Sequence, residues 1–239
     1  MLSIVIPTLN EKDYLPRLLE CLRRQSFRNF EVIVADAGSI DETEEVARAF
    51  GCKVVKGGLP AQGRNRGAEK AQGELILFLD ADVFLPDDFL EKTLKEFKER
   101  DLDIAAFSLI PLSEKKPPKL LFNFFYNYPL KIFEEKWPHG AMGILVKRSL
   151  HQRLKGFDEK IKFAEDHDYI KRASELRKFG VIKSTKIFVS LRRFRKEGWV
   201  KVGLKYAYAE IYRKFKGPIR KEIFQYKFGE FKSEDEYLE

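Results

Sequence analysis

The hydrophobic positions in residues 1–110 alternate between two patterns. Short apolar runs that end near a proline, an aspartate or a glycine are typical of β-strands, and the segments between them space their apolar residues as one face of an α-helix does. We expect strands at residues 2–7, 30–36, 52–57, 75–80 and 103–110, and helices at residues 12–25, 41–50, 61–72 and 87–100. This alternation predicts a parallel, doubly wound α/β sheet, which binds ligands beyond the carboxyl ends of its strands.

The pattern changes in the second half of the chain. A polar break with two prolines occupies residues 113–119, and residues 120–133 are dense in aromatic side chains. Beyond them we expect strands at 140–149 and 187–194 and helices at 166–179 and 198–216. The last helix is amphipathic, with one apolar stripe formed by Val200, Leu204, Ala207, Ile211 and Phe215. The chain therefore divides into an α/β domain over residues 1–195 and a helical extension over residues 196–239.

Charge separates the same two parts of the chain. Residues 1–119 carry 18 basic and 21 acidic side chains, whereas residues 120–239 carry 27 basic and 16 acidic ones. The positive excess lies in the last quarter, where it could meet anionic lipid, a phosphate-bearing acceptor or nucleic acid. No reading motif for nucleic acid is recognisable there, so we expect no nucleic-acid partner. We see no signal peptide and no transmembrane run, and we expect a cytoplasmic protein.

The most informative segment is LILFLDAD, residues 75–82. A strand buried on both faces carries charge only at great cost, so Asp80 and Asp82 should emerge at its carboxyl end. Two carboxylates there could hold a divalent cation with oxygen ligands. The alternative is that both aspartates only begin a loop, and the pair by itself does not decide between the two.

Polar residues also follow the other predicted strands. Asp36, after the second strand, can accept hydrogen bonds from a base or a ribose. Arg64, at the start of the third predicted helix, suits a diphosphate. Asp41 is better explained as a helix cap than as a ligand, and Glu11 could be either an acid of a helix start or a site residue.

At this point the chain resembles family 2 glycosyltransferases of the GT-A fold. The resemblance rests on four segments, SIVIPTLNE (3–11), VIVADAGSIDET (32–43), GRNRGAEKAQGELILFLDAD (63–82) and GFDEKIKFAEDHDY (156–169). It implies that residues 1–112 bind a nucleotide-diphospho-sugar and that residues 113–195 bind the acceptor. It further implies a Rossmann-like, mostly parallel sheet flanked by helices. The resemblance weakens after about residue 195, where the basic amphipathic extension begins.

The resemblance also implies roles for individual residues. Asp166 would be the catalytic base of an inverting transfer, within the motif that includes Glu165. Asp82 would be the main ligand of Mg²⁺ or Mn²⁺, with Asp80 beside it and near the ribose or sugar. Two further expectations come from position in the sequence and not from the resemblance: His139, just before Gly140, could lie on the acceptor side or the metal side, and His167 is expected to point away from the site if its neighbours point in. The remaining donor contacts would be Thr8, Asn10, Glu11, Asp36 and Arg64.

The partners follow from these roles. The donor would be UDP-linked or GDP-linked, and the acceptor would carry a sugar hydroxyl or a phosphate, lipid-linked in one alternative. For the helix at 198–216, two alternatives are peripheral contact with an anionic membrane and packing on the core with its lysines in water. A nucleotidyltransferase and an inactive nucleotide-sugar-binding protein are the competing functions. The former usually has a glycine-rich loop after its first strand, whereas this chain has PTLNE.

Overall fold

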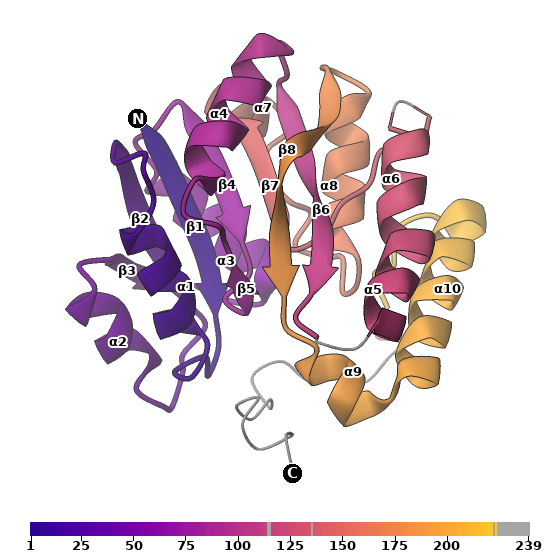
Figure 1. The fold of residues 1–239 in the computed structure, drawn as a ribbon, viewed down its shortest axis with the longest axis horizontal. Helices are drawn as coiled ribbons and strands as arrows, with labels where there is room; N and C mark the ends of the chain where they lie inside the picture. The colour runs from indigo at the N-terminus through magenta and orange to yellow at the C-terminus, as the bar shows by residue number, and fades with distance from the viewer. Residues whose placement is uncertain (114–115, 135, 222, 224–239) are drawn as a thin grey trace.

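The computed structural model describes residues 1–113, 116–134, 136–221 and 223 (Figure 1). Its centre is an eight-stranded sheet with the strand order β3-β2-β1-β4-β7-β6-β8-β5. The strands are β1 (Leu2–Thr8), β2 (Phe30–Asp36), β3 (Lys53–Lys56), β4 (Leu75–Leu79), β5 (Val83–Phe84), β6 (Ile104–Pro111), β7 (Gly143–Lys147) and β8 (Phe179–Val189). Part of the predicted extension, residues 224–239, lies outside the described residues.

The predicted α/β class is confirmed, with one change in strand arrangement. β3, β2, β1 and β4 pair in parallel, as the alternation of strands and helices indicated. The next strand in space is not β6 but β7, which runs antiparallel to both β4 and β6. β6 therefore points the same way as β4 although the two strands are not neighbours. The order of strands and helices along the chain cannot reveal such an insertion, because it does not report which strands pair.

Helices cover both faces of the sheet (Figure 1). Apolar side chains of α1 (Leu15–Arg23), α2 (Thr43–Ala49) and α4 (Phe89–Glu99) join one hydrophobic cluster on the first face. On the other face, a second cluster contains residues of α3 (Pro60–Glu69), α7 (Arg148–Arg153) and α8 (Glu165–Ser174). Successive residues of β1 alternate between these clusters, since Ile4 and Ile6 belong to the first and Val5 to the second. Both faces of the sheet are thus buried.

Two glycines let α3 lie close to β1. A Cβ atom on Gly67 would stand 2.3 Å from Cγ1 of Val5, and one on Gly63 would stand 2.9 Å from Cβ of Pro7. The glycines of the GRNRG segment therefore serve close packing of helix on strand. This packing sets the position of Arg64, which lies between them on the same helix.

Three predictions for the second half are wrong in detail. The predicted strand 187–194 ends at Val189, because Arg192 begins the helix α9 (Arg192–Glu197). The predicted helix 166–179 ends at Ser174, and Phe179 already begins β8. The proline-containing break leads into helical turns, which are compatible with prolines in a first turn. These turns are α5 (Lys116–Phe122), the π-helical η1 (Asn123–Asn127) and α6 (Tyr128–Ile132).

The predicted helix at 198–216 is confirmed as α10 (Trp199–Lys216). It lies with α5 and α6 at one edge of the molecule (Figure 1). None of the helices in the described part of the chain combines the length and the apolar character that crossing a membrane requires.

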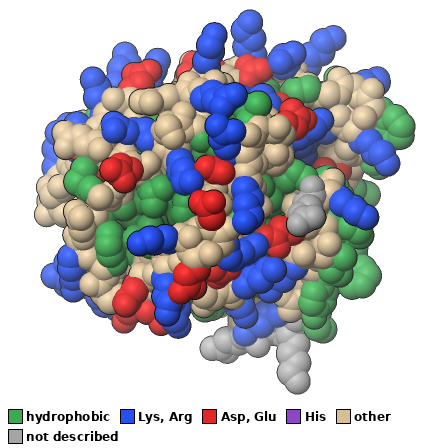
Figure 2. Space-filling view, turned by 90° about the horizontal axis from the view of Figure 1, so that it is seen from above, with side chains coloured by type: hydrophobic (Ala, Val, Ile, Leu, Met, Phe, Trp, Pro, Cys, Tyr) green, Lys and Arg blue, Asp and Glu red, His purple; other side chains and the backbone are tan. Residues whose placement is uncertain are grey.

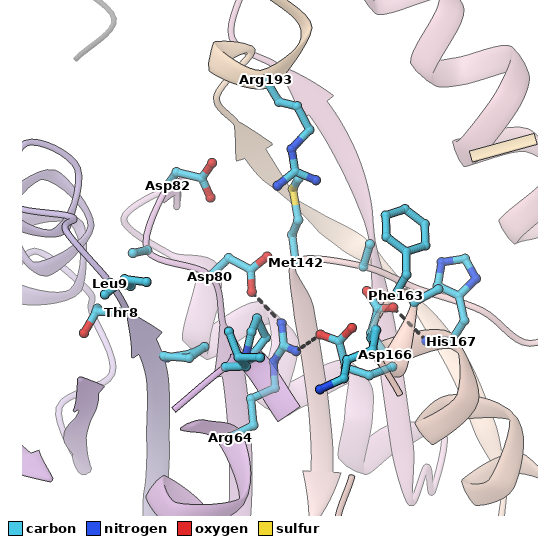
Figure 3. A pocket seen from close by; sticks show the side chains of 18 of the residues that line it. Thr8, Leu9, Arg64, Asp80, Asp82, Met142, Phe163, Asp166, His167 and Arg193 are labelled. Carbon is cyan, nitrogen blue, oxygen red and sulfur yellow. Dashed lines mark hydrogen bonds and ion pairs between the residues drawn. The ribbon is translucent and has the colours of Figure 1, made fainter. Parts of the chain in front are cut away.

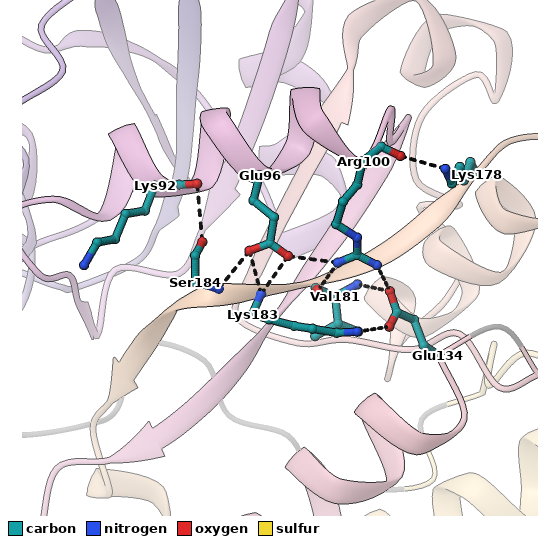
Figure 4. Close-up of polar contacts among 8 residues, drawn as sticks. All are labelled: Lys92, Glu96, Arg100, Glu134, Lys178, Val181, Lys183 and Ser184. Atoms are coloured by element: carbon teal, nitrogen blue, oxygen red, sulfur yellow. Dashed lines mark hydrogen bonds and ion pairs between the residues drawn. The ribbon is translucent and has the colours of Figure 1, made fainter.

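A polar network ties α4 to β8 where the pairing of β8 with β6 shifts its register (Figure 4). The Glu96 carboxylate accepts hydrogen bonds from the backbone N–H groups of Lys183, at 2.9 and 3.0 Å, and of Ser184, at 2.8 Å. Arg100 donates to Glu96 at 2.9 Å and also pairs with Glu134. Although burial raises the pKa of Glu96, the hydrogen bonds from Ser184 and Arg100 outweigh it, so the net pKa lies below 4.5.

We expect Glu96→Gln to lower the free energy of unfolding at pH 7 by about 1–2 kcal/mol, because the amide keeps one acceptor oxygen and loses the charge. The folded-state pKa of Glu96 is lowered, so its stabilising contribution is present above pH 4.5 and is lost as the pH falls through the folded-state pKa. Urea unfolding should therefore show a higher free energy of unfolding for the wild type than for Glu96→Gln at neutral pH, and this difference should disappear at acidic pH. Glu99→Gln, an exposed position on the same helix, is the control. A difference that is independent of pH would contradict this assignment.

Candidate functional site

A cleft lies at the carboxyl edge of the sheet (Figure 3). Its walls come from the end of β1, the start of α3, the loop between β4 and β5, the start of α8, and the helices α9 and α10. Figure 3 shows Asp80 and Asp82 on one side and Asp166 and His167 on the other, with Arg64 between them. The charged residues that line the cleft are Glu11, Arg64, Asp80, Asp82, Lys162, Glu165, Asp166, Arg192, Arg193 and Glu210.

Arg64 joins the two sides of the cleft. Its Nη2 donates to Asp80 at 2.7 Å and its Nη1 to Glu165 at 2.5 Å. The Arg64 side chain is only 6% exposed, so the guanidinium is largely shielded from water. Burial alone would lower the pKa of Arg64, but the charges of Asp80 and Glu165 raise it above its ordinary value, and the guanidinium stays ionised. Burial raises the pKa of Asp80, and Arg64 opposes that rise.

Arg192 joins Asp82 to Glu11 in a second ion-pair group. Its Nε donates to Asp82 at 2.9 Å, and its two Nη atoms donate to the two Glu11 oxygens at 2.7 Å each. The guanidinium also lies over the Tyr14 ring, with Cζ 4.4 Å from the ring centroid. Burial raises the pKa of Glu11 to about 7 in spite of Arg192. The sequence analysis placed Arg192 inside the predicted strand at 187–194, and it gave no indication of these partners.

The sheet brings Arg192 to Asp82 through a backbone pairing. Val83 in β5 pairs with Val189 at the end of β8, and the Ser190 N–H donates to the Asp82 carbonyl oxygen at 3.2 Å. The loop that carries Asp80 and Asp82 is therefore fixed against the end of β8. Arg192 follows two residues after Ser190 and reaches into the cleft.

The residues predicted for the nucleoside side divide into two groups. Thr8 and Glu11 line the cleft, whereas Asn10 and Asp36 are not among the described residues that line it. Asp36 accepts hydrogen bonds from the Thr8 hydroxyl at 2.8 Å and from the Ser39 N–H at 2.7 Å, and Asn10 accepts one from the Ile40 N–H at 3.0 Å. Both residues thus organise the adjoining loops. Their contacts with a base stay a prediction.

Asp166 lies at the start of α8, directly after Ala164 and Glu165. Ala164 adopts a left-handed conformation, with φ of 58°, and this turns the chain into the helix. Asp166 accepts a hydrogen bond from the His167 N–H at 2.8 Å, and its side chain lines the cleft. The structure therefore brings Asp166 into the same cleft as the two aspartates of the β4–β5 loop.

The two histidines near Asp166 differ from expectation. His167 lines the cleft, where its Nδ1 lies 3.1 Å from Glu210 of α10. His139 is not among the described residues of the lining, and its ring packs 5.7 Å from that of His167. Burial lowers the pKa of His139 to about 4, so it is neutral at pH 7. Glu210 was not predicted from the sequence, because it belongs to a helix that appeared separate from the catalytic domain.

The carboxylates that line the cleft suit a divalent cation that a bound substrate phosphate would also coordinate. Asp80 and Asp82 line the cleft from one loop, and Mg²⁺ is commonly bound by one or two carboxylates together with substrate phosphate oxygens. Within residues 1–113, 116–134, 136–221 and 223, no group of three or more His, Cys, Asp and Glu side chains is arranged to hold a metal. The residues present therefore fit a cation that a diphosphate helps to hold, and they do not form a complete cage.

Two curated glycosyltransferases are similar to this chain in sequence. An uncharacterized glycosyltransferase EpsJ from Bacillus subtilis is 27% identical over 188 residues, which cover 71% of this chain and 54% of that protein. A poly(ribitol-phosphate) β-N-acetylglucosaminyltransferase TarS from Staphylococcus aureus is 27% identical over 130 residues, which cover 50% of this chain and 23% of that protein. The chain thus spans about half or less of the length of these relatives.

Solved structures of glycosyltransferases share the fold. S. aureus TarS in complex with UDP-GlcNAc gives a TM-score of 0.65 at 22% identity, covering 79% of this chain and 58% of that chain. A mannosyltransferase from Pyrobaculum calidifontis in complex with GDP-Man and Mn²⁺ gives a TM-score of 0.65 at 21% identity, covering 87% and 64%. The predicted GT-A fold is therefore confirmed. The model of "Glycosyl transferase family 2" matches residues 3–152, and the chain belongs to that family.

Proposed function

We propose that this protein is an inverting glycosyltransferase. It moves a sugar from a nucleotide-diphospho-sugar to an acceptor hydroxyl or phosphate, with the help of a divalent cation. The observation that carries the proposal is that Asp80 and Asp82 line one side of a single cleft while Asp166 lines the other. A transfer with inversion needs this separation, because the base acts on the face opposite the leaving group.

The donor would bind along the ends of β1, β2 and β4. Arg64 lies in a position to contact a diphosphate, and the loop shaped by Asn10 and Asp36 borders the nucleoside. Two structural neighbours carry nucleotide sugars, one with UDP and one with GDP, which supports the donor class and leaves the nucleotide open. Thr8 and Glu11 would complete this side of the cleft.

Asp82 and Asp80 would hold Mg²⁺ or Mn²⁺ together with diphosphate oxygens. When bound, the cation offsets the negative charge that builds on the leaving diphosphate. The ion pairs with Arg192 and Arg64 hold these two carboxylates in place before the donor arrives.

Asp166 would accept the proton of the acceptor hydroxyl as that oxygen attacks the sugar. The transition state of such a transfer has oxocarbenium character, as in glycoside hydrolysis, and needs no covalent bond to the enzyme. The Asp166 oxygen that accepts the His167 N–H fixes the orientation of the carboxylate, so the other oxygen can face the acceptor. Glu210 and Tyr206 of α10 line the cleft near this position and would contact the acceptor.

The first test is calorimetric titration with UDP, GDP, CDP and dTDP, each in Mn²⁺, in Mg²⁺ and in EDTA. We expect one nucleotide to bind only when a cation is present. Asp82→Ala should abolish that binding, because it removes the main cation ligand. Asp88→Ala, which removes a surface partner of Lys92, should bind as the wild type does. Binding that is equal in EDTA would contradict the role of the cation.

The second test separates the base from the donor site. Asp166→Asn should keep nucleotide affinity and lower turnover by about 10²–10⁴-fold, because the amide cannot accept a proton. Turnover is measured as nucleoside diphosphate released from the sugar donor whose nucleotide binds in the titration. Asp168→Asn, two residues away and paired with Arg172 at 2.8 Å, is the matched control. Full turnover in Asp166→Asn would show that the base lies elsewhere, and no turnover in the wild type would favour an inactive binding protein.

A further inference from the structure

The apolar stripe of α10 faces solvent and not the core. Four of its members are large side chains that are 60–77% exposed: Val200, Leu204, Ile211 and Phe215. Their helix contacts the rest of the molecule with its opposite face, through Val202 and Ala209, which are 1% exposed. The helix therefore packs on the core with Lys201 and Lys214 exposed, as one of the two alternatives expected, but the face that packs is not the predicted apolar stripe.

A second exposed stripe lies on the helical segment α5–η1–α6. Leu120, Phe124, Phe125, Tyr128 and Ile132 are between 55% and 71% exposed. Soluble proteins rarely expose apolar side chains of this size in one continuous area, and such areas mark sites of protein or membrane contact.

Two series of ring and polar contacts link the two helical segments that carry these stripes. At one end, Phe122 of α5 packs 5.6 Å from Phe194, which packs 4.5 Å from Trp199 at the start of α10. Farther along, a second series runs from η1 to α10 through Tyr126, His139, His167 and Glu210. Figure 1 shows α5, α6 and α10 together at one edge of the molecule. We call the two exposed stripes together the apolar edge.

Positive charge surrounds the apolar edge. The exposed residues Lys201 and Lys214 flank the stripe on α10, and Lys119 and Lys131 are exposed on the other segment. Residues 192–216 contain nine basic and two acidic residues. Arg192 is buried in the cleft, and Lys205 and Arg213 are paired with Glu197 and Glu210, so the other six basic residues are the ones that can contribute charge here. Figure 2, seen from above, shows hydrophobic side chains with Lys and Arg beside them at the edge where these helices lie.

We propose that the apolar edge docks on the surface of an anionic lipid bilayer. Aromatic and aliphatic side chains on an exposed helical face with lysines beside them are the pattern by which helices lie in a membrane interface. The positive charge beside the apolar edge complements the negative head groups of acidic lipids. A protein partner would have to carry acidic side chains around a matching apolar surface. The docking proposal does not rest on the proposed glycosyl transfer.

The position of the cleft gives docking a consequence, which rests on the proposed function. Tyr206, Ala209 and Glu210 on the inner side of α10 line the cleft, while the outer side of the same helix carries the apolar edge. A bilayer against the outer side would lie next to the acceptor half of the cleft. An acceptor whose phosphate or sugar is anchored to lipid could then enter directly from the membrane.

The test uses the full chain and vesicles of phosphatidylcholine, with or without phosphatidylglycerol. We expect the wild type to float with vesicles that contain phosphatidylglycerol, less with phosphatidylcholine alone, and less at high salt. The chain has two tryptophans, Trp137, which is 47% exposed, and Trp199, and both lie beside the apolar edge. Brominated lipid in the same anionic vesicles should therefore quench the intrinsic tryptophan fluorescence, a readout that needs no variant.

The double variant Ile211→Ser/Phe215→Ser should weaken vesicle partitioning by about tenfold or more, because it removes two apolar side chains from the contact. Phe50→Ser, an exposed phenylalanine at the end of α2, is the matched control and should partition like the wild type. Nucleotide binding in each variant reports whether the fold is intact.

Absence of wild-type binding to anionic vesicles at low salt would overturn docking, and so would equal partitioning of the double variant. Another outcome is a wild-type dimer that does not bind vesicles and that dissociates in Ile211→Ser/Phe215→Ser. That result would assign the apolar edge to contact with a second copy of the chain and would also overturn membrane docking. Nucleotide titration separates the two proposals. If the protein binds nucleotide but not vesicles, only the docking proposal is overturned. A protein that binds vesicles and no nucleotide loses the proposed reaction alone.

Discussion

Two buried arginines hold together the carboxylates on which the cleft depends. Asp80 and Glu165 share Arg64, and Asp82 and Glu11 share Arg192. Carboxylates that converge in a partly dry site repel each other, and each would be costly to bury without a cation. Removing one partner of such a pair typically costs about 3–5 kcal/mol, because the remaining charge is left uncompensated. The guanidinium pairs thus allow an acidic cleft to exist within a stable fold.

The same two arginines also connect parts of the chain that are distant in sequence. Arg64 lies on α3 and reaches the end of β4 and the start of α8, so it links the two sides of the cleft. Arg192 lies at the start of α9 and reaches back 181 residues to Glu11. In the proposed reaction, donor and acceptor need fixed positions relative to each other, and these contacts fix the walls that would hold them.

α10 has two different faces, and each has a consequence for function. Its inner face closes the cleft through Tyr206, Ala209 and Glu210, so the helix belongs to the site and is not a separate appendage. Its outer face exposes apolar side chains that the core does not use. A helix that lines a cleft on one side and offers an apolar surface on the other can bring a surface-bound substrate close to the chemistry.

The sequence by itself determined the α/β class, the strands of the first half except the two-residue β5, and the set of polar residues at their carboxyl ends. It could do so because apolar periodicity reports burial on a strand or a helix, and parallel strands gather their carboxyl ends at one edge. Only the tertiary structure decided that β7 lies between β4 and β6, because periodicity does not encode strand pairing. The partners of Arg192 and the outward direction of the α10 stripe were likewise decided there. Strand pairing, ion-pair partners and the direction of a helix face all depend on contacts between residues that are distant in sequence. A local sequence pattern carries no information about such contacts.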